Sequence, residues 1–162
     1  MESPLRVAIL TVSDSVVRGV YADRSGPAVA EACRVRGWNV AVTAVLPDDQ
    51  AGIEKQLSEW ADSSAFEAIL TTGGTGIGPR DVTPEATAAV CARLIPGLAE
   101  EMRRKGVALT PRAALSRAVV GVRAVTLIVN LPGSPQGAAE SLGAIAALLP
   151  HAAKIVRGDR HE

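Results

Sequence analysis

The sequence predicts an α/β fold in which a mainly parallel sheet is covered by helices on both faces. Three observations lead to this prediction. Apolar, β-rich segments alternate with helical patterns, the strand-like segments are mostly apolar throughout, and glycine, proline or small polar residues follow them. The chain has 162 residues and no internal repeat or low-complexity linker, so we expect a single domain spanning residues 1–162.

The first predicted unit runs from strand to loop to helix to strand. Residues 6–13, RVAILTVS, are continuously apolar, which is typical of a strand buried on both faces. The polar, glycine-bearing residues 14–26 predict a loop. Residues 27–37 begin with proline, follow a helical pattern and end with glycine, so they predict a helix. Residues 38–46, WNVAVTAVL, predict the second strand.

An amphipathic helix and a third strand follow. The helical pattern covers residues 47–62, and Asp48 and Asp49 are candidate N-caps because a carboxylate can accept hydrogen bonds from free backbone N–H groups. Residues 66–72, FEAILTT, predict another buried strand. This strand leads directly into a glycine-rich segment.

Two helices are predicted after the glycine-rich segment. Residues 83–94 form the first, with Thr83 expected as its N-cap and Pro84 at its first helical position. Residues 97–109 form the second, shorter helix. Both separate the third strand from the next β segments, as a parallel sheet requires.

The last part of the chain returns to the sheet and ends in a helix. Residues 117–133 contain two short β segments around Gly121 to Ala124. Residues 135–158 predict a long helix with a kink at Pro150, because proline lacks the backbone N–H that a helix interior needs.

Composition excludes several classes of protein. The formal net charge is zero and aromatic residues make up 2%, which argues against a nucleic-acid-binding surface. No apolar run approaches the ~20 residues that span a bilayer, and no signal peptide is apparent, so we expect no membrane partner. Cys33 and Cys91 lie in helix-like segments without ligand spacing, so we expect buried free thiols and a cytoplasmic protein.

The segment LTTGGTGIGPRDVTPEAT, residues 70–87, is the strongest functional signal. Four glycines stand within the six residues 73–78, between a predicted strand and a predicted helix. The segment lacks the lysine of a P-loop, and Pro79 stands where the dinucleotide fingerprint needs its third glycine. Bare backbone amides can approach a phosphate or a pterin closely. A tight turn without a ligand is the alternative interpretation.

Three aspartates are expected near these glycines. Asp81 follows the glycines, Asp48 ends a predicted strand, and Asp23 lies in ADRSGP. Ligands bind at the carboxyl ends of the strands in parallel sheets, where the segments TVSDS, VLPDD, TTGGTG and VNLPGSP should converge. Three carboxylates beside bare amides suit a hydrated Mg²⁺ that bridges phosphates. The alternatives are a role for Asp81 at the helix start and ordinary surface solvation for each acid.

These motifs resemble those of the molybdopterin adenylyltransferase family, which includes the plant G domain and the N-terminal domain of gephyrin. TVSDS, DRSGP, PDD, TTGGTGIGPRDVTPEAT, LSRAVVGVR and NLPGSP occur in the same order, from about Val7 to Gly158. The resemblance implies a trimeric α/β protein of the molybdopterin-binding fold. It implies a reaction in which molybdopterin is adenylylated with ATP and Mg²⁺, with release of pyrophosphate, before a partner protein inserts molybdate.

The resemblance also implies roles for individual residues. Asp48 and Asp81 resemble the acids that govern Mg²⁺ and adenylyl transfer. The residues that resemble substrate- or nucleotide-binding positions are Ser13, Asp23, Arg24, Gly73, Gly74, Thr75, Gly76, Ser116, Arg117, Asn130, Pro132 and Gly133. Two departures are noted: Asp49 replaces a frequent glutamate, and Gly106 stands where the plant domain has a polar residue, so one ligand contact is expected to be missing.

The chemistry needs no side-chain nucleophile, because the terminal phosphate of molybdopterin can attack the α-phosphorus of ATP. Positioning and charge neutralisation remain for the protein. Arg24 and Arg117 lie inside the motifs and are expected at the site, whereas Arg80 and Arg123 could equally be surface residues. Two other functions stay open: a non-catalytic pterin- or nucleotide-binding trimeric module, and an enzyme domain that acts on another pyrophosphate nucleotide.

Overall fold

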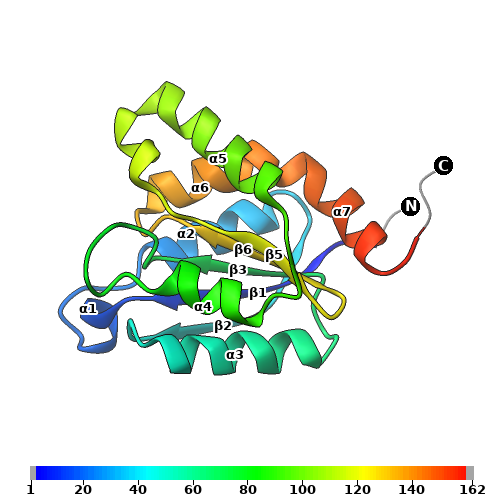
Figure 1. Cartoon of the computed structure of the whole chain (residues 1–162), viewed down its shortest axis with the longest axis horizontal. Helices are drawn as coiled ribbons and strands as arrows, with labels where there is room; N and C mark the ends of the chain where they lie inside the picture. The colour runs from blue at the N-terminus through cyan, green and yellow to red at the C-terminus, as the bar shows by residue number, and fades with distance from the viewer. Residues whose placement is uncertain (1–2, 160–162) are drawn as a thin grey trace.

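The computed structural model describes residues 3–159, and within them six strands form one sheet in the order β2-β1-β3-β6-β5-β4 (Figure 1). Neighbouring strands are parallel from β2 to β6, whereas β5 runs antiparallel to β6 and β4 to β5. The predicted mainly parallel sheet is therefore confirmed. The strands are β1 (Arg6–Val12), β2 (Asn39–Leu46), β3 (Ala68–Thr72), β4 (Arg93–Leu94), β5 (Val120–Arg123) and β6 (Thr126–Leu131).

Helices cover both faces of this sheet, as the sequence predicts. Figure 1 shows α2, α5 and α6 on one face and α3 and α4 on the other. The helical segments are α1 (Asp14–Val17), α2 (Ser25–Arg34), α3 (Gln50–Asp62), α4 (Thr83–Val90), α5 (Pro96–Leu109), the 3₁₀ helix η1 (Pro111–Leu115), α6 (Pro135–Ile145), the 3₁₀ helix η2 (Ala146–Leu148) and α7 (Leu149–Val156).

Two hydrophobic clusters hold the layers together, and β1 contributes to both. Val7 and Ile9 pack in the cluster that includes α2, α5, α6 and α7. Ala8 and Leu10 point to the opposite face and pack with α3 and α4. Successive strand residues alternate between faces, so a continuously apolar strand is what a sheet covered on both sides requires.

Helix starts differ from the expected ones near the front of the chain. The predicted loop 14–26 contains the short helix α1, for which Ser13 is the N-cap. The next helix, α2, begins at Ser25 rather than at the proline two residues later, because the Asp23 carboxylate accepts a hydrogen bond from the N–H of Gly26 at 3.0 Å. Asp49, and not Asp48, is the N-cap of α3, and its side chain accepts from Gly52 N at 2.8 Å.

The helix after the glycine-rich segment was predicted incorrectly at both ends. Val82 occupies the N-cap position of α4, so Thr83 is the first helical residue and does not cap with its side chain. The helix ends at Val90 because the chain then extends into β4, which pairs with β5. Cys91 consequently lies outside the helix. Cys33 is buried in α2 and Cys91 is half-buried, and burial raises the pKa of both thiols to about 11.

The predicted irregularity in the last helix takes the form of a short 3₁₀ turn, through which the helical winding continues. The segment is divided into α6, η2 and α7, with the irregular turn just before Pro150. The proline ring clashes with the carbonyl four residues earlier, that of Ala146, which places the disruption on the N-terminal side of the proline.

By length and composition alone, Pro135–Val156 could cross a membrane, with a window of mean hydropathy 1.2, so the expectation that no such run exists was too strict. In this fold Ala138, Leu142, Ile145 and Leu149 of that segment lie in the larger core cluster. Core helices of globular domains pass the same test.

Candidate functional site

The carboxyl ends of β1, β2, β3 and β6 meet at one edge of the sheet. The register pairs Thr11 of β1 with Thr72 of β3, and Thr72 with Leu131 of β6. In the sheet, β2 lies on one side of β1 and β3 lies on the other side. Order reverses between β1 and β3, and crevices for ligands form at such a reversal. The predicted convergence of the strand-end segments is confirmed.

The first two glycines of the loop are needed by the backbone itself. Gly73 has φ +103° and Gly74 has φ +71°, a region that side-chain-bearing residues rarely adopt. A Cβ on Gly73 would collide with the carbonyl oxygen of Val12, and one on Gly74 with the hydroxyl of Thr83. The backbone of this tight turn therefore needs glycine at both positions, whether or not a ligand binds to the loop.

The next two glycines make room for the carboxylate of Asp81. A Cβ on Gly76 or Gly78 would stand 2.9 or 3.0 Å from Asp81 Oδ2, closer than carbon and oxygen pack. The N–H of Gly78 donates to the same oxygen at 2.9 Å. The loop thus wraps around Asp81 and holds its carboxylate, which explains why the aspartate follows so many glycines.

Asp48 is held by a reciprocal pair of hydrogen bonds with Asp14. Asp14 N donates to Asp48 Oδ2 at 3.0 Å, and Asp48 N donates to Asp14 Oδ1 at 2.9 Å. Arg80 forms a salt bridge with Asp14 at 3.1 Å, and this contact lowers the pKa of Asp14. Burial, together with the negative charges of Asp14 and Asp81, raises the pKa of Asp48 despite its hydrogen bond.

Arg117 fastens the glycine loop instead of facing a cavity. Its Nε donates to Gly76 O at 2.8 Å and its Nη2 to Asp81 O at 2.9 Å. Its Nη1 binds both carboxylate oxygens of Glu85, the shorter contact being 2.8 Å. A planar guanidinium presents donors in a fixed fork, and here all three nitrogens are engaged within the protein.

Several other predicted residues are also engaged. The Asp23 carboxylate accepts from Gly26 N and from the Thr11 hydroxyl, at 3.0 and 2.9 Å. The fully buried Asn130 donates to the hydroxyls of Thr71 and Thr87. These side chains shape the site and fix its backbone. Arg123 lies at the far end of the sheet, beyond both cavities described next, where it pairs with Asp62 at 3.0 Å.

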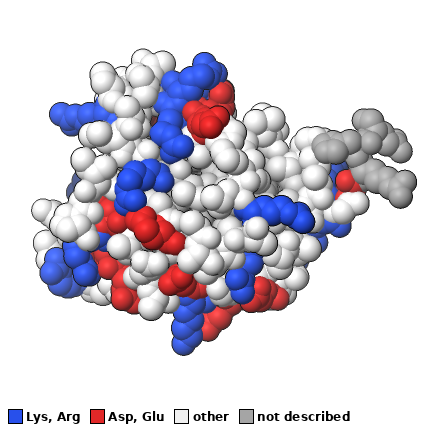
Figure 2. Space-filling model, viewed as in Figure 1, with Lys and Arg blue, Asp and Glu red and all other residues white. Residues whose placement is uncertain are grey.

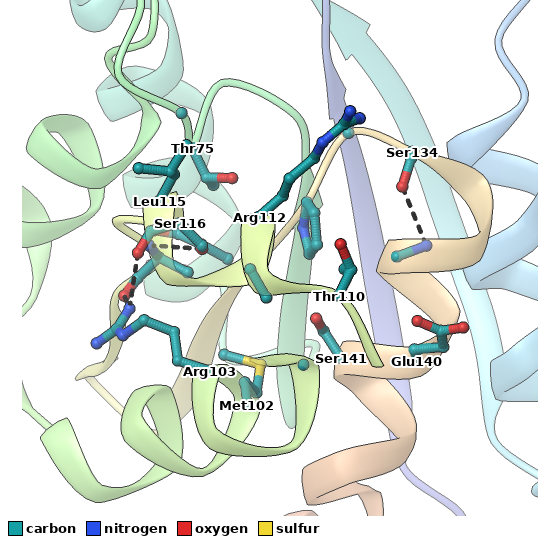
Figure 3. Close-up of a pocket in the computed structure, with 18 of the residues that line it drawn as sticks. Thr75, Met102, Arg103, Thr110, Arg112, Leu115, Ser116, Ser134, Glu140 and Ser141 are labelled. Carbon is teal, nitrogen blue, oxygen red and sulfur yellow. Dashed lines mark hydrogen bonds between the residues drawn. The ribbon is translucent and has the colours of Figure 1, made fainter. Parts of the chain in front are cut away.

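Two cavities open at this edge of the sheet. The larger has a volume of about 760 Å³ and lies between α5 with η1 on one side and α6 on the other (Figure 3). The smaller has a volume of about 640 Å³ and lies beside α1 and the start of α2. Both volumes are in the range of small-molecule sites. Gly74, Asp81 and Gly133 line both cavities, so the two meet at the glycine loop.

Every predicted site residue except Arg117 lines at least one cavity. The larger contains Gly74, Thr75, Gly76, Asp81, Ser116, Asn130, Pro132 and Gly133. The smaller contains Ser13, Asp23, Arg24, Asp48, Gly73, Gly74, Asp81 and Gly133. Gly106, the departure noted in the sequence, also lines the larger cavity. A Cβ on it would stand 2.8 Å from Ala113 Cβ, so a side chain there would displace η1.

Sequence reasoning missed the basic rim of the larger cavity. Arg103, Lys105 and Arg112 line it from α5 and η1, with Glu140 and Ser141 on α6 opposite (Figure 3). Figure 2 shows several basic side chains over α5 with an acidic patch directly beside them. A basic face on an amphipathic helix is ordinarily solvated surface, and only packing against α6 makes it a cavity wall. Asp14 was detectable, because it stands two residues after the end of β1, as Asp48 stands two residues after the end of β2.

The acids fit a cation that brings most of its own ligands. In the described residues no group of three or more His, Cys, Asp or Glu side chains could hold a metal. Asp48 and Asp81 line the same cavity, and neither forms a salt bridge within that part of the chain. Mg²⁺ typically uses one or two carboxylates, with waters and substrate phosphates for the rest. The donor set therefore suits Mg²⁺ delivered with a nucleotide.

Comparison with known proteins gives one consistent family. Residues 8–151 match the family described as probable molybdopterin binding domain. The molybdopterin adenylyltransferase of Helicobacter pylori is 36% identical over 157 residues, covering 96% of this chain and 89% of the relative. The Escherichia coli K12 protein of that name is 41% identical over 146 residues, covering 85% and 72%.

Solved structures agree with the sequence relatives. The crystal structure of the molybdopterin biosynthesis enzyme MoaB from Thermus thermophilus superposes with a TM-score of 0.90. It is 50% identical and covers 98% of this chain and 99% of its own. The fold is thus shared with a solved protein of molybdopterin biosynthesis.

Proposed function

This chain belongs to the family of probable molybdopterin-binding domains, and from that premise we propose that it is an enzyme that adenylylates molybdopterin in molybdenum cofactor biosynthesis. The relatives named molybdopterin adenylyltransferase match over most of the chain. In the proposed reaction ATP is the adenylyl donor and pyrophosphate is released.

The observation that carries this proposal is the junction of two cavities at Gly74, Asp81 and Gly133. A reaction between two bound substrates needs two sites whose reacting ends adjoin. The smaller cavity contains Asp48 and Asp23 and suits a metal-bound triphosphate. The larger cavity, walled by apolar parts of α5 and α6 and rimmed by basic side chains, suits a pterin that carries a terminal phosphate.

The reaction is a displacement at phosphorus. An oxygen of the molybdopterin phosphate forms a bond to the α-phosphorus of ATP, the bond to the bridging oxygen breaks, and pyrophosphate leaves with the electron pair. The attacking group is already an anion, so no side-chain base is required. The protein has to align the two phosphates and offset their repulsion, which is the main contribution of enzymes to phosphoryl transfer.

Residues on each side of the junction have separate tasks in this proposal. Asp48 and Asp81 would hold Mg²⁺, and the ion when bound would neutralise charge on the phosphates of ATP. Arg112 lines the larger cavity and would offset the charge of the molybdopterin phosphate. Arg117 keeps the loop backbone in place through Gly76 and Asp81.

The start of α6 provides another favourable position for an anion. Gly133, Ser134 and Pro135 lie at the mouths of the cavities, and Ser134 caps the helix by accepting from Gly137 N at 3.0 Å. The N-terminus of an eleven-residue helix carries a partial positive charge, which favours a nearby phosphate.

We further infer a cytoplasmic homotrimer that passes its product to a molybdate-inserting partner. The resemblance to the family supports the trimer and the partner, and the two free cysteines suit a reducing compartment. Basic and acidic side chains are interspersed on the face seen in Figure 2, and net charge is zero, so we propose no nucleic-acid or membrane partner.

The decisive experiment is incubation with molybdopterin, ATP and Mg²⁺, followed by detection of adenylylated molybdopterin and pyrophosphate. We expect both products in equal amounts, and none when any of the three components is omitted. Binding of molybdopterin without turnover would indicate a non-catalytic pterin-binding module of the same fold. Cleavage of ATP without molybdopterin would indicate an enzyme for another pyrophosphate nucleotide.

A further inference from the structure

The hydroxyl of Thr83 is buried and has no hydrogen-bond partner. Thr83 is fully buried. Among the buried side-chain oxygen and nitrogen atoms of the described residues, its Oγ1 alone has no hydrogen-bond partner. Buried hydroxyls in native proteins nearly always hydrogen-bond, because the loss of water is otherwise uncompensated. An isolated exception packed against Gly74 of the glycine loop calls for a physical explanation.

Other buried threonines show that this fold can satisfy hydroxyl groups. Thr72 donates to Pro132 O at 2.7 Å, and Thr126 donates to Phe66 O at 2.8 Å. Thr71 and Thr87 accept hydrogen bonds from Asn130 at 3.1 and 2.8 Å. Thr83 differs from them in its position, directly behind the glycine loop.

The hydroxyl of Thr83 and the carboxylate of Asp48 converge on the bare face of Gly74. A Cβ on Gly74 would collide with Thr83 Oγ1 and would stand 3.2 Å from Asp48 Oδ1. The backbone fixes this arrangement, because Thr83 N donates to Gly74 O at 3.2 Å. Asp48 uses its other oxygen, Oδ2, for the hydrogen bond from Asp14. Oδ1 of Asp48 and Oγ1 of Thr83 thus face the same side of the loop.

We propose that Thr83 is a positioning residue of the cation site, whose hydroxyl accepts a hydrogen bond from a water carried by the Mg²⁺ that Asp48 holds. The inference rests on the proposed function, since that function brings the ion to this place. Mg²⁺ keeps several of its waters when it binds protein, and these waters need acceptors. A hydroxyl fixed on a helix and free of other partners is a suitable acceptor.

This role has a consequence that a purely structural hydroxyl would not have. Thr83→Val keeps the shape of the side chain and removes an oxygen that has no partner in the free protein. We expect the melting temperature of ligand-free Thr83→Val to equal or exceed that of the wild type, because an uncompensated buried polar group is removed. A hydroxyl that stabilised the fold would give the opposite shift.

The test measures how strongly Mg²⁺ enhances nucleotide binding. The probe is an ATP analogue with a methylene bridge between the α- and β-phosphates, titrated calorimetrically in EDTA and again with Mg²⁺. In Thr83→Val we expect the enhancement by Mg²⁺ to fall about 10-fold, the scale of losing a residue that supports metal ligands, while the affinity in EDTA stays unchanged. Thr83→Ser, which keeps the hydroxyl, should restore most of the enhancement.

Thr126→Val is the matched control, since it removes a buried hydroxyl that has a partner, at the opposite end of the sheet. It should lower the melting temperature and leave the Mg²⁺ enhancement at the wild-type value. An unchanged enhancement in Thr83→Val, or a melting temperature below that of the wild type, would overturn the inference. If the wild type itself shows no enhancement by Mg²⁺, the metal site of the proposed function fails instead.

Discussion

Asp48 and Asp81 bring negative charge to the junction of the two cavities, and several backbone contacts hold their carboxylates in place. Gly76 and Gly78 leave space for Asp81, and Asp14 fixes Asp48 through two backbone hydrogen bonds. Both acids are partly buried, and like charges that are partly shielded from water repel one another unless a ligand neutralises them. At the scale of single residues, this arrangement fits the proposed function, in which a cation would arrive with the substrate.

Asp81→Asn should lower the rate of adenylyl transfer by at least ~10²-fold, the scale on which the loss of one electrostatic stabiliser is felt. Asparagine keeps an oxygen for the N–H of Gly78, so the loop and the binding of molybdopterin should be retained. Steady-state rates of product formation, with parallel molybdopterin titrations, measure both. Asp49→Asn is the control, since asparagine caps α3 equally well and turnover should not change. Near-normal turnover in Asp81→Asn would refute the metal-site role.

Asp48→Asn should stabilise the ligand-free protein while lowering its turnover. Burial and the charges of Asp14 and Asp81 raise the pKa of Asp48, so its ionised form is disfavoured in the folded state. That cost is complete above the folded pKa and disappears as the pH falls through it. Thermal melts from pH 8 to pH 4 should show a higher melting temperature for Asp48→Asn at pH 8 and a shrinking difference at lower pH. A difference that grows towards pH 4 would contradict the assignment.

At the scale of elements, the sequence predicts the strands except β4, which it places inside a helix, and it predicts the starts of the main helices to within about two residues without deciding which side chain caps them. β1 and β3 consist mostly of apolar residues, with buried threonines among them, and this pattern is typical of strands that are buried on both faces. Helix starts depend on which side chain reaches which N–H, and Asp23, Asp49 and Thr83 are all suitable types. Only the folded backbone decides that Asp49 caps α3 and that Thr83 does not cap α4. The side chains of Asp48 and Thr83 are therefore not used as helix caps.

The candidate site was predictable where a motif joins consecutive residues and unpredictable where packing assembles it. Asp48, Asp81 and the glycine loop are visible in the sequence because each follows a strand of a parallel sheet. The role of Arg117 as a fastener depends on Glu85, 32 positions away, and no spacing rule indicates that pair. The basic wall from Arg103 to Arg112 becomes a site only because α5 packs against α6.

Arg117→Lys should loosen the glycine loop and so impair both substrates. A lysine cannot reach Gly76 O, Asp81 O and Glu85 at once, and displacement of the loop by about 1 Å can cost up to ~10²-fold in kcat/KM. Arg123→Lys is the matched control, because Arg123 joins Asp62 and Val90 O in a similar way, outside both cavities. Both variants should melt at lower temperature, but only Arg117→Lys should lower kcat/KM. Equal kinetic effects would assign Arg117 a general structural role.

At the scale of the whole molecule, we expect three copies of the chain to associate. Five large apolar side chains are more than 60% exposed in the single chain: Val20, Tyr21, Val35, Ile77 and Leu109. Burying such side chains between copies would be favourable, and the family resemblance supports a trimer. Light scattering after size-exclusion chromatography should give three times the mass of the chain. A monomer at micromolar concentration would contradict this prediction.

The division of the molecule into two substrate cavities gives the last prediction. Ser141 on α6 lines only the larger cavity, and Ser15 on α1 lines only the smaller one. Ser141→Trp should fill the larger cavity and abolish molybdopterin binding while nucleotide binding persists, and Ser15→Trp should do the reverse. Each variant is the control for the other, and calorimetric titrations with molybdopterin and with the methylene-bridged ATP analogue measure both. A reversed pattern would exchange the two substrates between the cavities. Loss of both ligands in both correctly folded variants would mean that the substrates share one site, which would remove the geometric basis for direct transfer between adjoining cavities.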